Sequence, residues 1–212
     1  MRPYERDPQR IYSQSFATVR AEANLDRFDP GLEALAIRII HACGMVEIAD
    51  RIAFSKDAYA AGHEALRLGK SILCDVEMVA AGIIRKYLPS ENEIITTLND
   101  PGTQRRALDI QNTRSAAAVE LWEPHIEGAV VAIGNAPTAL FHLLDLIDKG
   151  FPKPAVILGF PVGFVGAAES KAELVSRPRG CEFIALKGRK GGSAIASAAV
   201  NALAAGLPED KP

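Results

Sequence analysis

The sequence predicts a single α/β domain over residues 1–212, with a five-stranded, mainly parallel sheet between two layers of helices. Two observations predict this three-layer α/β/α fold. Short runs rich in β-branched residues alternate with helical patterns, and the runs are apolar on both faces. Strands covered by helices on two sides need that composition, and the alternation favours parallel pairing. A chain of 212 residues also suits one domain with a full core.

The elements follow in order along the chain. Three helical stretches precede the first strand, near Ser15–Arg27, Pro30–Cys43 and Lys56–Leu68. The predicted strands are Ser71–Cys74, Glu93–Leu98, Ala129–Ile133, Ala155–Leu158 and Phe183–Leu186. The helices that alternate with them are Asp75–Lys86, Gln104–Trp122, Thr138–Lys149, Ser170–Ser176 and Ser193–Ala205. Residues 206–212 are expected to form a flexible tail.

The second helix has the clearest local signals. Asp29 is a typical N-cap residue, and Pro30 at the first helical position loses no hydrogen bond. Gly44 can adopt the left-handed conformation that ends a helix. At about 100° per residue, His41 falls about 180° from the apolar Leu32, so it is predicted to lie away from its own core. The last turn of a helix favours a charged imidazole, whereas burial under an apolar ligand would oppose the charge.

Charge and cysteine content exclude several classes of protein. The 24 basic and 26 acidic residues nearly cancel, which leaves none of the positive field that duplex nucleic acid requires. The apolar runs are far shorter than the ~20 residues that span a bilayer, so no membrane partner is expected. Cys43, Cys74 and Cys181 form neither an even set nor a CxxC pair. These thiols predict a reducing, cytoplasmic environment.

Three predicted strands lead into loops rich in small residues, at 134–138, 159–166 and 188–193. Open α/β sheets bind their ligands at the carboxyl ends of strands, and the helix N-termini that follow suit carboxylate or phosphate groups. Each loop alone is explained equally well by a tight turn, but the three together favour an anionic ligand. None of them matches the dinucleotide or P-loop fingerprint.

Other chemistries have weaker signals. No Gly-x-Ser-x-Gly elbow is present, and His63, His125 and His142 lie in separate segments, so they are expected to be structural or surface residues. No metal site is expected. Asp75 and Glu77 follow the first predicted strand, where they either orient a ligand or cap a helix.

Three basic residues lie beside the small-residue loops. Arg114, Lys171 and Arg189 either pair with substrate carboxylates or are solvated surface charges. The residues alone leave this choice open.

Six segments, in order along nearly the whole chain, closely resemble the precorrin-8X methylmutase family. They are His41–Gly44, Cys74–Val79, Asn112–Ala117, Gly134–Leu140, Pro161–Lys171 and Gly188–Ser193.

The resemblance implies an isomerase of cobalamin (vitamin B12) biosynthesis that uses no redox or group-transfer cofactor. Such an enzyme converts precorrin-8X to hydrogenobyrinic acid by moving a methyl group from ring carbon 11 to carbon 12. In the family, the histidine that matches His41 is catalytic, either protonating a ring nitrogen or steering the tautomer, and the active site lies at a homodimer interface. The residues expected to bind the substrate are Arg114, Ser115, Asn135, Thr138, Gly163, Lys171, Arg189 and Ser193.

Two other classes of function remain as alternatives. A tetrapyrrole carrier would use the same loops without turnover. A His41→Ala variant that still binds the pigment but no longer converts it would distinguish the enzyme from a carrier. A nucleotide-binding α/β oxidoreductase would bind nicotinamide, which the missing fingerprint argues against. Whether the substrate is metal-free or contains cobalt is not encoded in any of these motifs.

Overall fold

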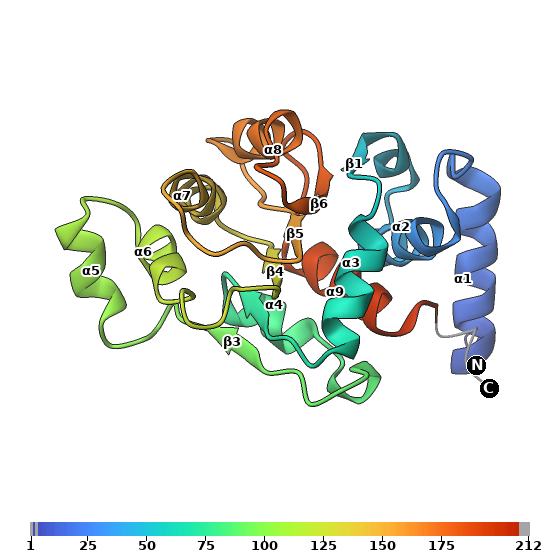
Figure 1. Ribbon diagram of the computed structural model, residues 1–212. Coiled ribbons are helices and arrows are strands. Elements are labelled where there is room, and N and C mark those ends of the chain that lie inside the picture. Colours follow the sequence, from blue (N-terminus) through green and yellow to red (C-terminus); the bar gives the residue numbers. More distant parts are fainter. Residues whose placement is uncertain (1, 3, 208–212) are drawn as a thin grey trace.

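The computed structural model describes residues 2 and 4–207, and within them one mixed sheet is covered by helices on both faces (Figure 1). The strands are β1 (Ile52–Phe54), β2 (Ile72–Cys74), β3 (Ile94–Thr96), β4 (Val130–Ile133), β5 (Val156–Gly159) and β6 (Glu182–Leu186). The α-helices are α1 (Pro8–Glu22), α2 (Pro30–Cys43), α3 (Ala58–Arg67), α4 (Glu77–Gly82), α5 (Thr103–Asp109), α6 (Arg114–Glu120), α7 (Pro137–Asp148), α8 (Ala167–Ser176) and α9 (Ser193–Ala205). Two short 3₁₀ helices are η1 (Val46–Arg51) and η2 (Arg85–Tyr87).

The sheet has six strands in the described part of the chain, so the prediction of five was wrong. Their order is β1-β6-β5-β4-β2-β3. The five predicted strands are all present and pair in parallel, and the sixth, β1, pairs antiparallel with β6. β1 was missed because Ile52–Phe54 contains only one β-branched residue and directly follows η1, so no separate strand pattern emerges.

The core is divided into two layers by the sheet. Alternate residues of each strand face opposite sides, so Leu73 and Val131 pack with α7, whereas Ile72 and Val130 pack with α2 and α9. The helices α6, α7 and α8 cover one face, and α2, α3, α4 and α9 cover the other (Figure 1). Helix α1 lies outside α2. The three-layer arrangement is therefore confirmed.

Helices α2 and α9 have the predicted bounds, α3, α7 and α8 differ from theirs by one to three residues at an end, and three other predicted helices differ more. The predicted helix Asp75–Lys86 is divided into α4 and η2, because Ile83 and Ile84 between them are extended. The predicted helix Gln104–Trp122 is broken into α5 and α6, because Gln111 adopts a left-handed conformation with φ 51° and Thr113 caps a new helix. Helix α1 begins at Pro8 instead of Ser15, since the Asp7 carboxylate accepts hydrogen bonds from the first free N–H groups.

The end of the described chain packs against the body. The Leu207 side chain is buried, and the Gly206 carbonyl accepts a hydrogen bond from Arg38 at 3.0 Å. The remainder of the expected tail, 208–212, lies outside the described residues.

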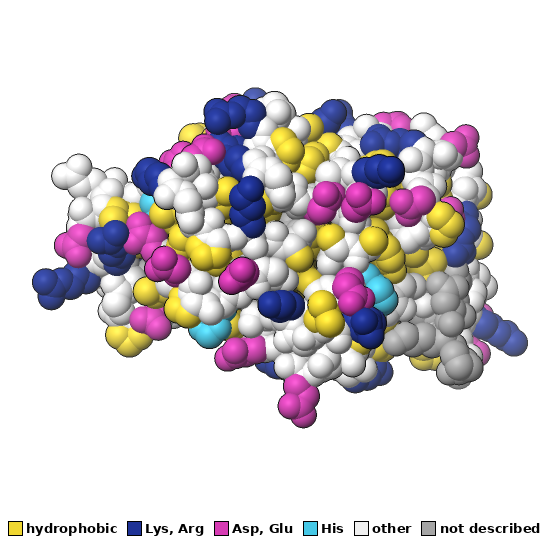
Figure 2. Space-filling model, viewed as in Figure 1, with side chains coloured by type: hydrophobic (Ala, Val, Ile, Leu, Met, Phe, Trp, Pro, Cys, Tyr) yellow, Lys and Arg dark blue, Asp and Glu magenta, His cyan; other side chains and the backbone are white. Residues whose placement is uncertain are grey.

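The surface carries charges of both signs. On the face shown in Figure 2, acidic and basic side chains are interspersed with apolar ones. Within the described residues, no helix is both long enough and apolar enough to cross a membrane.

Candidate active site

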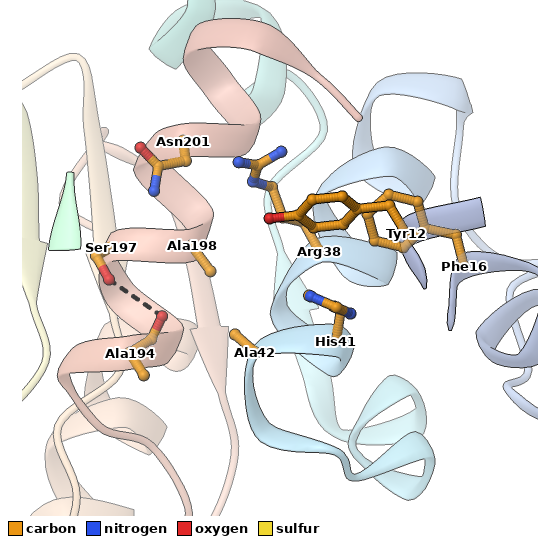
Figure 3. Close-up of a pocket in the computed structure, with 9 residues that line it drawn as sticks. All are labelled: Tyr12, Phe16, Arg38, His41, Ala42, Ala194, Ser197, Ala198 and Asn201. Carbon is orange, nitrogen blue, oxygen red and sulfur yellow. Dashed lines mark hydrogen bonds between the residues drawn. The ribbon is translucent and has the colours of Figure 1, made fainter. Parts of the chain in front are cut away.

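His41 lies in the last turn of α2, at a cavity of about 210 Å³ between α1, α2 and α9 (Figure 3). As predicted, it is directed away from the apolar face of α2 and is exposed. The cavity is lined by Tyr12, Phe16, Arg38, His41, Ala42, Ala194, Ser197, Ala198 and Asn201. A second cavity of about 280 Å³ adjoins the other side of His41, between α1 and the end of α2.

Helix α1 holds the His41 ring in place. The Ser15 hydroxyl lies 2.7 Å from His41 Nδ1, within hydrogen-bond distance. The Phe16 ring packs edge-on against the imidazole at 5.2 Å between centroids, and the Tyr12 ring lies at 5.6 Å. With Nδ1 engaged by α1, one ring nitrogen points across the cavity toward α9 (Figure 3).

Two effects lower the pKa of His41 below its ordinary value. Partial removal of the ring from water is the larger, and the positive charge of Arg38 adds to it. A ring with a lowered pKa is a stronger acid but is protonated in a smaller fraction of molecules near neutral pH.

Of the residues that line this cavity, only His41 was predicted as a site residue, and Arg38 is the charged residue that was missed. It precedes His41 by three positions on α2, so the two side chains share a helix face. This spacing could have indicated that Arg38 lies beside His41. The apolar residues around Arg38, however, give no indication that a cavity forms there. The residue is 8% exposed.

The opposite wall of the cavity is α9, which is fixed by buried polar contacts. Asn201 donates to the Gly82 carbonyl at 2.9 Å and accepts from the Ile84 N–H at 2.8 Å. Ser197 donates to the Ala194 carbonyl within the helix. The polar groups of α9 at the cavity are therefore already used inside the protein.

The β4–α7 loop, residues 134–136, is held by Asp75. This buried carboxylate accepts hydrogen bonds from the N–H groups of Gly134, Asn135 and Ala136, at 2.9, 2.9 and 2.8 Å. Burial raises the pKa of Asp75, and the three N–H donors oppose that rise. These N–H groups were predicted to favour an anionic ligand, but the anion that they bind is the protein's own carboxylate.

The β5–α8 loop (160–166) and the β6–α9 loop (187–192) form one unit. Gly192 donates to the Phe160 carbonyl at 2.9 Å, and Gly163 donates to the Arg189 carbonyl at 3.2 Å. A Cβ atom at Gly191 would lie 2.2 Å from the Phe160 carbonyl oxygen. Glycine is therefore required at 191 by the close approach of the two loops.

The Lys171 side chain links the same two loops through hydrogen bonds on their buried side. Its side chain is fully buried, and Nζ donates to the carbonyls of Pro161 at 2.9 Å and Lys190 at 2.6 Å. Burial lowers the pKa of Lys171 to about 8. Because the ammonium group is enclosed and hydrogen-bonded within the protein, Lys171 positions the loops and does not reach their outer surface.

Stability at alkaline pH should reveal this buried lysine. The folded pKa of about 8 lies below the unfolded value of about 10.4, so the unfolded chain binds more protons between these values. The contribution of Lys171 to the unfolding free energy therefore rises with pH through this window and is lost as pH falls through about 8. A neutral amine also keeps two N–H groups for the two carbonyls.

We expect the unfolding free energy of the wild type, relative to Lys171→Met, to increase by on the order of 2 kcal/mol between pH 7 and pH 10. Urea unfolding at both pH values measures this difference. Lys149→Met, at an exposed position, is the matched control and should show no such change. An equal difference at the two pH values would contradict the assignment.

The other predicted binding residues lie on loops and in the first turns of helices at the carboxyl edge of the sheet. Arg114 is exposed and donates to the Leu98 carbonyl and to Asn99 Oδ1. Arg189 is exposed and lies over the Phe164 ring. The remaining positions are the exposed Asn135, the half-buried Ser115, Thr138 and Gly163, and the buried Ser193.

None of the eight predicted binding residues lines the His41 cavity, but one loop lies directly beside it. The β6–α9 loop leads into α9, whose first turn contributes Ala194 to the cavity wall. Lys190 of that loop forms an ion pair with Glu47, just after the turn that follows His41. The cavity and the binding loops thus adjoin at one edge of the molecule.

Apolar side chains are exposed at this edge. Phe164 and Val165 of the β5–α8 loop are 84% and 88% exposed, and Met78 at the start of α4 is 73% exposed. An apolar ligand or a second protein surface would remove these side chains from water.

The other three histidines lie away from this cavity. His63 Nδ1 lies 2.7 Å from the Leu203 carbonyl, and His142 pairs with Glu120 at 3.0 Å, so the expected structural role of these two is confirmed. His125 is exposed. Among the described residues, no group of three or more His, Cys, Asp or Glu side chains is placed to hold a metal ion.

Fold and site together define an α/β protein that offers a histidine to a ligand beside the carboxyl edge of its sheet. Residues 10–205 match the family model described as precorrin-8X methylmutase. The chain therefore belongs to the precorrin-8X methylmutase family. Members of this family are isomerases of cobalamin biosynthesis, and this chain is one of them.

Individual relatives agree with the family assignment. A precorrin-8X methylmutase of Pseudomonas aeruginosa is 59% identical over 201 residues, covering 95% of this chain and 97% of that protein. A cobalt-precorrin-8 methylmutase of Priestia megaterium is 36% identical, covering 95% and 89%. The crystal structure of a precorrin-8X methylmutase from Thermus thermophilus matches with a TM-score of 0.83 and 37% identity, covering 92% and 94%.

Proposed function

We propose that the protein converts precorrin-8X to hydrogenobyrinic acid by moving a methyl group from ring carbon 11 to carbon 12, with His41 as the catalytic residue. The observation that carries the proposal is the position of His41. Its ring is held at Nδ1 by Ser15 and presents a nitrogen to a cavity beside the binding loops. A histidine held in this way is suited to donate a proton near neutral pH.

The reaction needs no co-reactant. The imidazolium form of His41 donates its proton to a nitrogen of the macrocycle, which selects the tautomer from which the methyl group migrates. The bond from the methyl group to carbon 11 breaks as the bond to carbon 12 forms. Return of the proton to His41 leaves an isomer of the substrate and the starting enzyme.

Residues at the carboxyl ends of the strands are suited to contact the macrocycle. The exposed cations of Arg114 and Arg189 are suited to bind the acetate and propionate side chains of the substrate. Asn135, Thr138 and Ser115 add polar groups, Gly163 and Ser193 shape the loops, and Lys171 holds two of the loops in place. The exposed Phe164 provides an apolar surface for the ring system.

We infer that the metal-free tetrapyrrole is the natural substrate. The relative named for precorrin-8X is 59% identical, whereas the relative named for the cobalt-containing form is 36% identical. Assay of the purified protein with both forms tests this inference. Faster conversion of precorrin-8X supports it, and faster conversion of the cobalt form overturns it. Binding of either pigment without conversion would favour a carrier and overturn the proposed reaction.

We also propose that the active protein is a cytoplasmic homodimer with His41 near the interface. The three cysteines are free, which fits a reducing compartment. The His41 cavity of about 210 Å³ is smaller than the roughly 300–1,000 Å³ of pockets for drug-sized ligands, and a tetrapyrrole is larger still. A second subunit would supply the missing wall and cover the exposed Phe164 and Val165.

Sedimentation velocity at micromolar concentration should therefore show a single species of twice the 22.7 kDa chain mass. Replacing both Phe164 and Val165 by Ser is expected to shift this species toward the monomer by at least tenfold in dissociation constant, because two apolar side chains lose their cover. Leu108→Ser removes another exposed apolar side chain, from α5, and is the control. A wild type that sediments only as monomer would refute the dimer.

A further inference from the structure

Arg38 places a buried positive charge in the wall of the His41 cavity. The residue is 8% exposed, yet its guanidinium group faces the cavity beside the Tyr12 ring (Figure 3). Nη1 donates to the Gly206 carbonyl at 3.0 Å, and the group lies over the Tyr87 ring at 5.5 Å. Two sides of the guanidinium are thus fixed, and its position toward the cavity is set by the fold.

Among the residues that the structure describes, no carboxylate pairs with the charge of Arg38. Within the described part of the chain, its partners are a backbone carbonyl and the phenol groups of Tyr87 and Tyr12, which are neutral near pH 7. Burial lowers the pKa of Arg38, but a guanidinium remains protonated in proteins. A buried charge without a counter-charge is costly, and five N–H donors exceed what one carbonyl and the Tyr87 hydroxyl can accept.

A carboxylate of the ligand fits this group, since the described residues that line the cavity include no carboxylate. The cavity residues contributed by α9, Ala194, Ser197, Ala198 and Asn201, are uncharged, and the amide of Asn201 is already hydrogen-bonded. The tetrapyrrole of the proposed reaction carries acetate and propionate groups around its ring. Arginine binds such groups through paired N–H donors.

The same charge acts on His41. Arg38 is three residues earlier on α2 and disfavours protonation of the imidazole. Of the other groups facing His41, α1 contributes the phenol of Tyr12, and Glu22 lines the adjoining cavity. Helix α9 contributes only the neutral Ser197 and Asn201. Arg38 is therefore the cation that a bound carboxylate would neutralise next to His41.

We propose that Arg38 binds one carboxylate of the tetrapyrrole, and that neutralisation of its charge by this carboxylate makes His41 take up the proton that it donates to the ring. The inference rests on the proposed function for the identity of the ligand. On this proposal, binding of the substrate is the step at which His41 becomes protonated. Arg38 is then both a binding residue and a positioning residue for the proton.

The first test uses the wild-type protein labelled with ¹⁵N-histidine. The His41 signals, assigned by their loss in His41→Asn, are followed against pH without ligand, with hydrogenobyrinic acid, and with its fully methyl-esterified form. We expect the titration midpoint of His41 to move to higher pH by about one pH unit or more with the acid, and to move less or downward with the ester. Equal midpoints with acid and ester would overturn the proposal.

The second test compares Arg38→Met with Arg38→Lys. Arg38→Met should weaken binding of hydrogenobyrinic acid by about 10- to 100-fold, as expected for a lost charge-assisted hydrogen bond, but should change binding of the ester by less than threefold. Arg38→Lys should recover part of the affinity for the acid. Arg67→Met, which removes an exposed cation of α3, is the charge control and should bind both ligands normally.

Equal weakening for the acid and the ester in Arg38→Met would overturn the carboxylate assignment. If Arg38→Met does not fold, as judged by circular dichroism, the wild-type titrations with acid and ester decide the question. A separate result tests the proposed function. A wild type that never converts precorrin-8X refutes the reaction, whereas a His41 titration midpoint that moves with the acid but not with the ester would still support the carboxylate subsite.

Discussion

Replacing His41 by Asn is expected to slow single-turnover conversion of precorrin-8X at least about a hundredfold while leaving pigment affinity within a few-fold of the wild type. The Asn amide can still contact Ser15, and the cavity keeps its shape, but an amide cannot give up a proton near neutral pH. Rapid mixing of substrate with excess enzyme, followed by absorbance, measures the step without product release.

His125→Asn is the matched control, because His125 is exposed and does not line the cavity. It should convert the pigment at the wild-type rate. A near-normal rate in His41→Asn would reduce the role of the protein to orienting the substrate.

The conversion rate should also depend on pH in one direction. His41 must be protonated to act as an acid, so the rate should fall as pH rises through its pKa. In the free enzyme that pKa lies below the ordinary 6.5, owing to partial burial and Arg38. The fall in kcat/KM should therefore begin below the pH typical of histidine, and the fall in the single-turnover rate of the bound complex should lie at higher pH.

Replacing Asp75 by Ala is expected to lower the free energy of unfolding by about 2–5 kcal/mol, because three N–H donors lose their acceptor at about 1–3 kcal/mol for each buried group. Relief from burying the carboxylate offsets part of this loss. Urea unfolding followed by circular dichroism measures the change. Activity should fall as well, since the same hydrogen bonds hold the β4–α7 loop.

Glu77→Gln is the control for Asp75. Glu77 lies two residues away at the same edge and accepts a hydrogen bond from Asn99 at an exposed position, so its replacement should cost less than about 1 kcal/mol. If Asp75→Ala were as stable as Glu77→Gln, the carboxylate would not be holding the loop.

The sequence was sufficient to predict the parallel core because strands buried on both faces, such as Val130–Ile133, have a distinctive composition. It also predicted both ends of α2, where Asp29 caps the helix and Gly44 is left-handed. The break at Gln111 was not predicted, since glutamine rarely adopts a left-handed conformation.

The site was predicted in part. His41 was identified by its helix face and by family resemblance. Arg38 was not, because its cavity exists only once α9 packs against α2. Lys171 was predicted to bind the ligand, and Asp75 either to orient a ligand or to cap a helix. The sequence does not show which way these side chains turn, and both turn inward.

The most direct test of the central claim is to follow the methyl group itself. Precorrin-8X carrying a ¹³C-labelled methyl group on carbon 11 would be incubated with the purified wild-type protein, and the product analysed by ¹³C NMR. The account predicts that the label moves to carbon 12 with no exchange into or out of the molecule, and that His41→Asn binds the pigment without moving it. A label that remains on carbon 11 of a tightly bound pigment would contradict the account and identify the protein as a carrier.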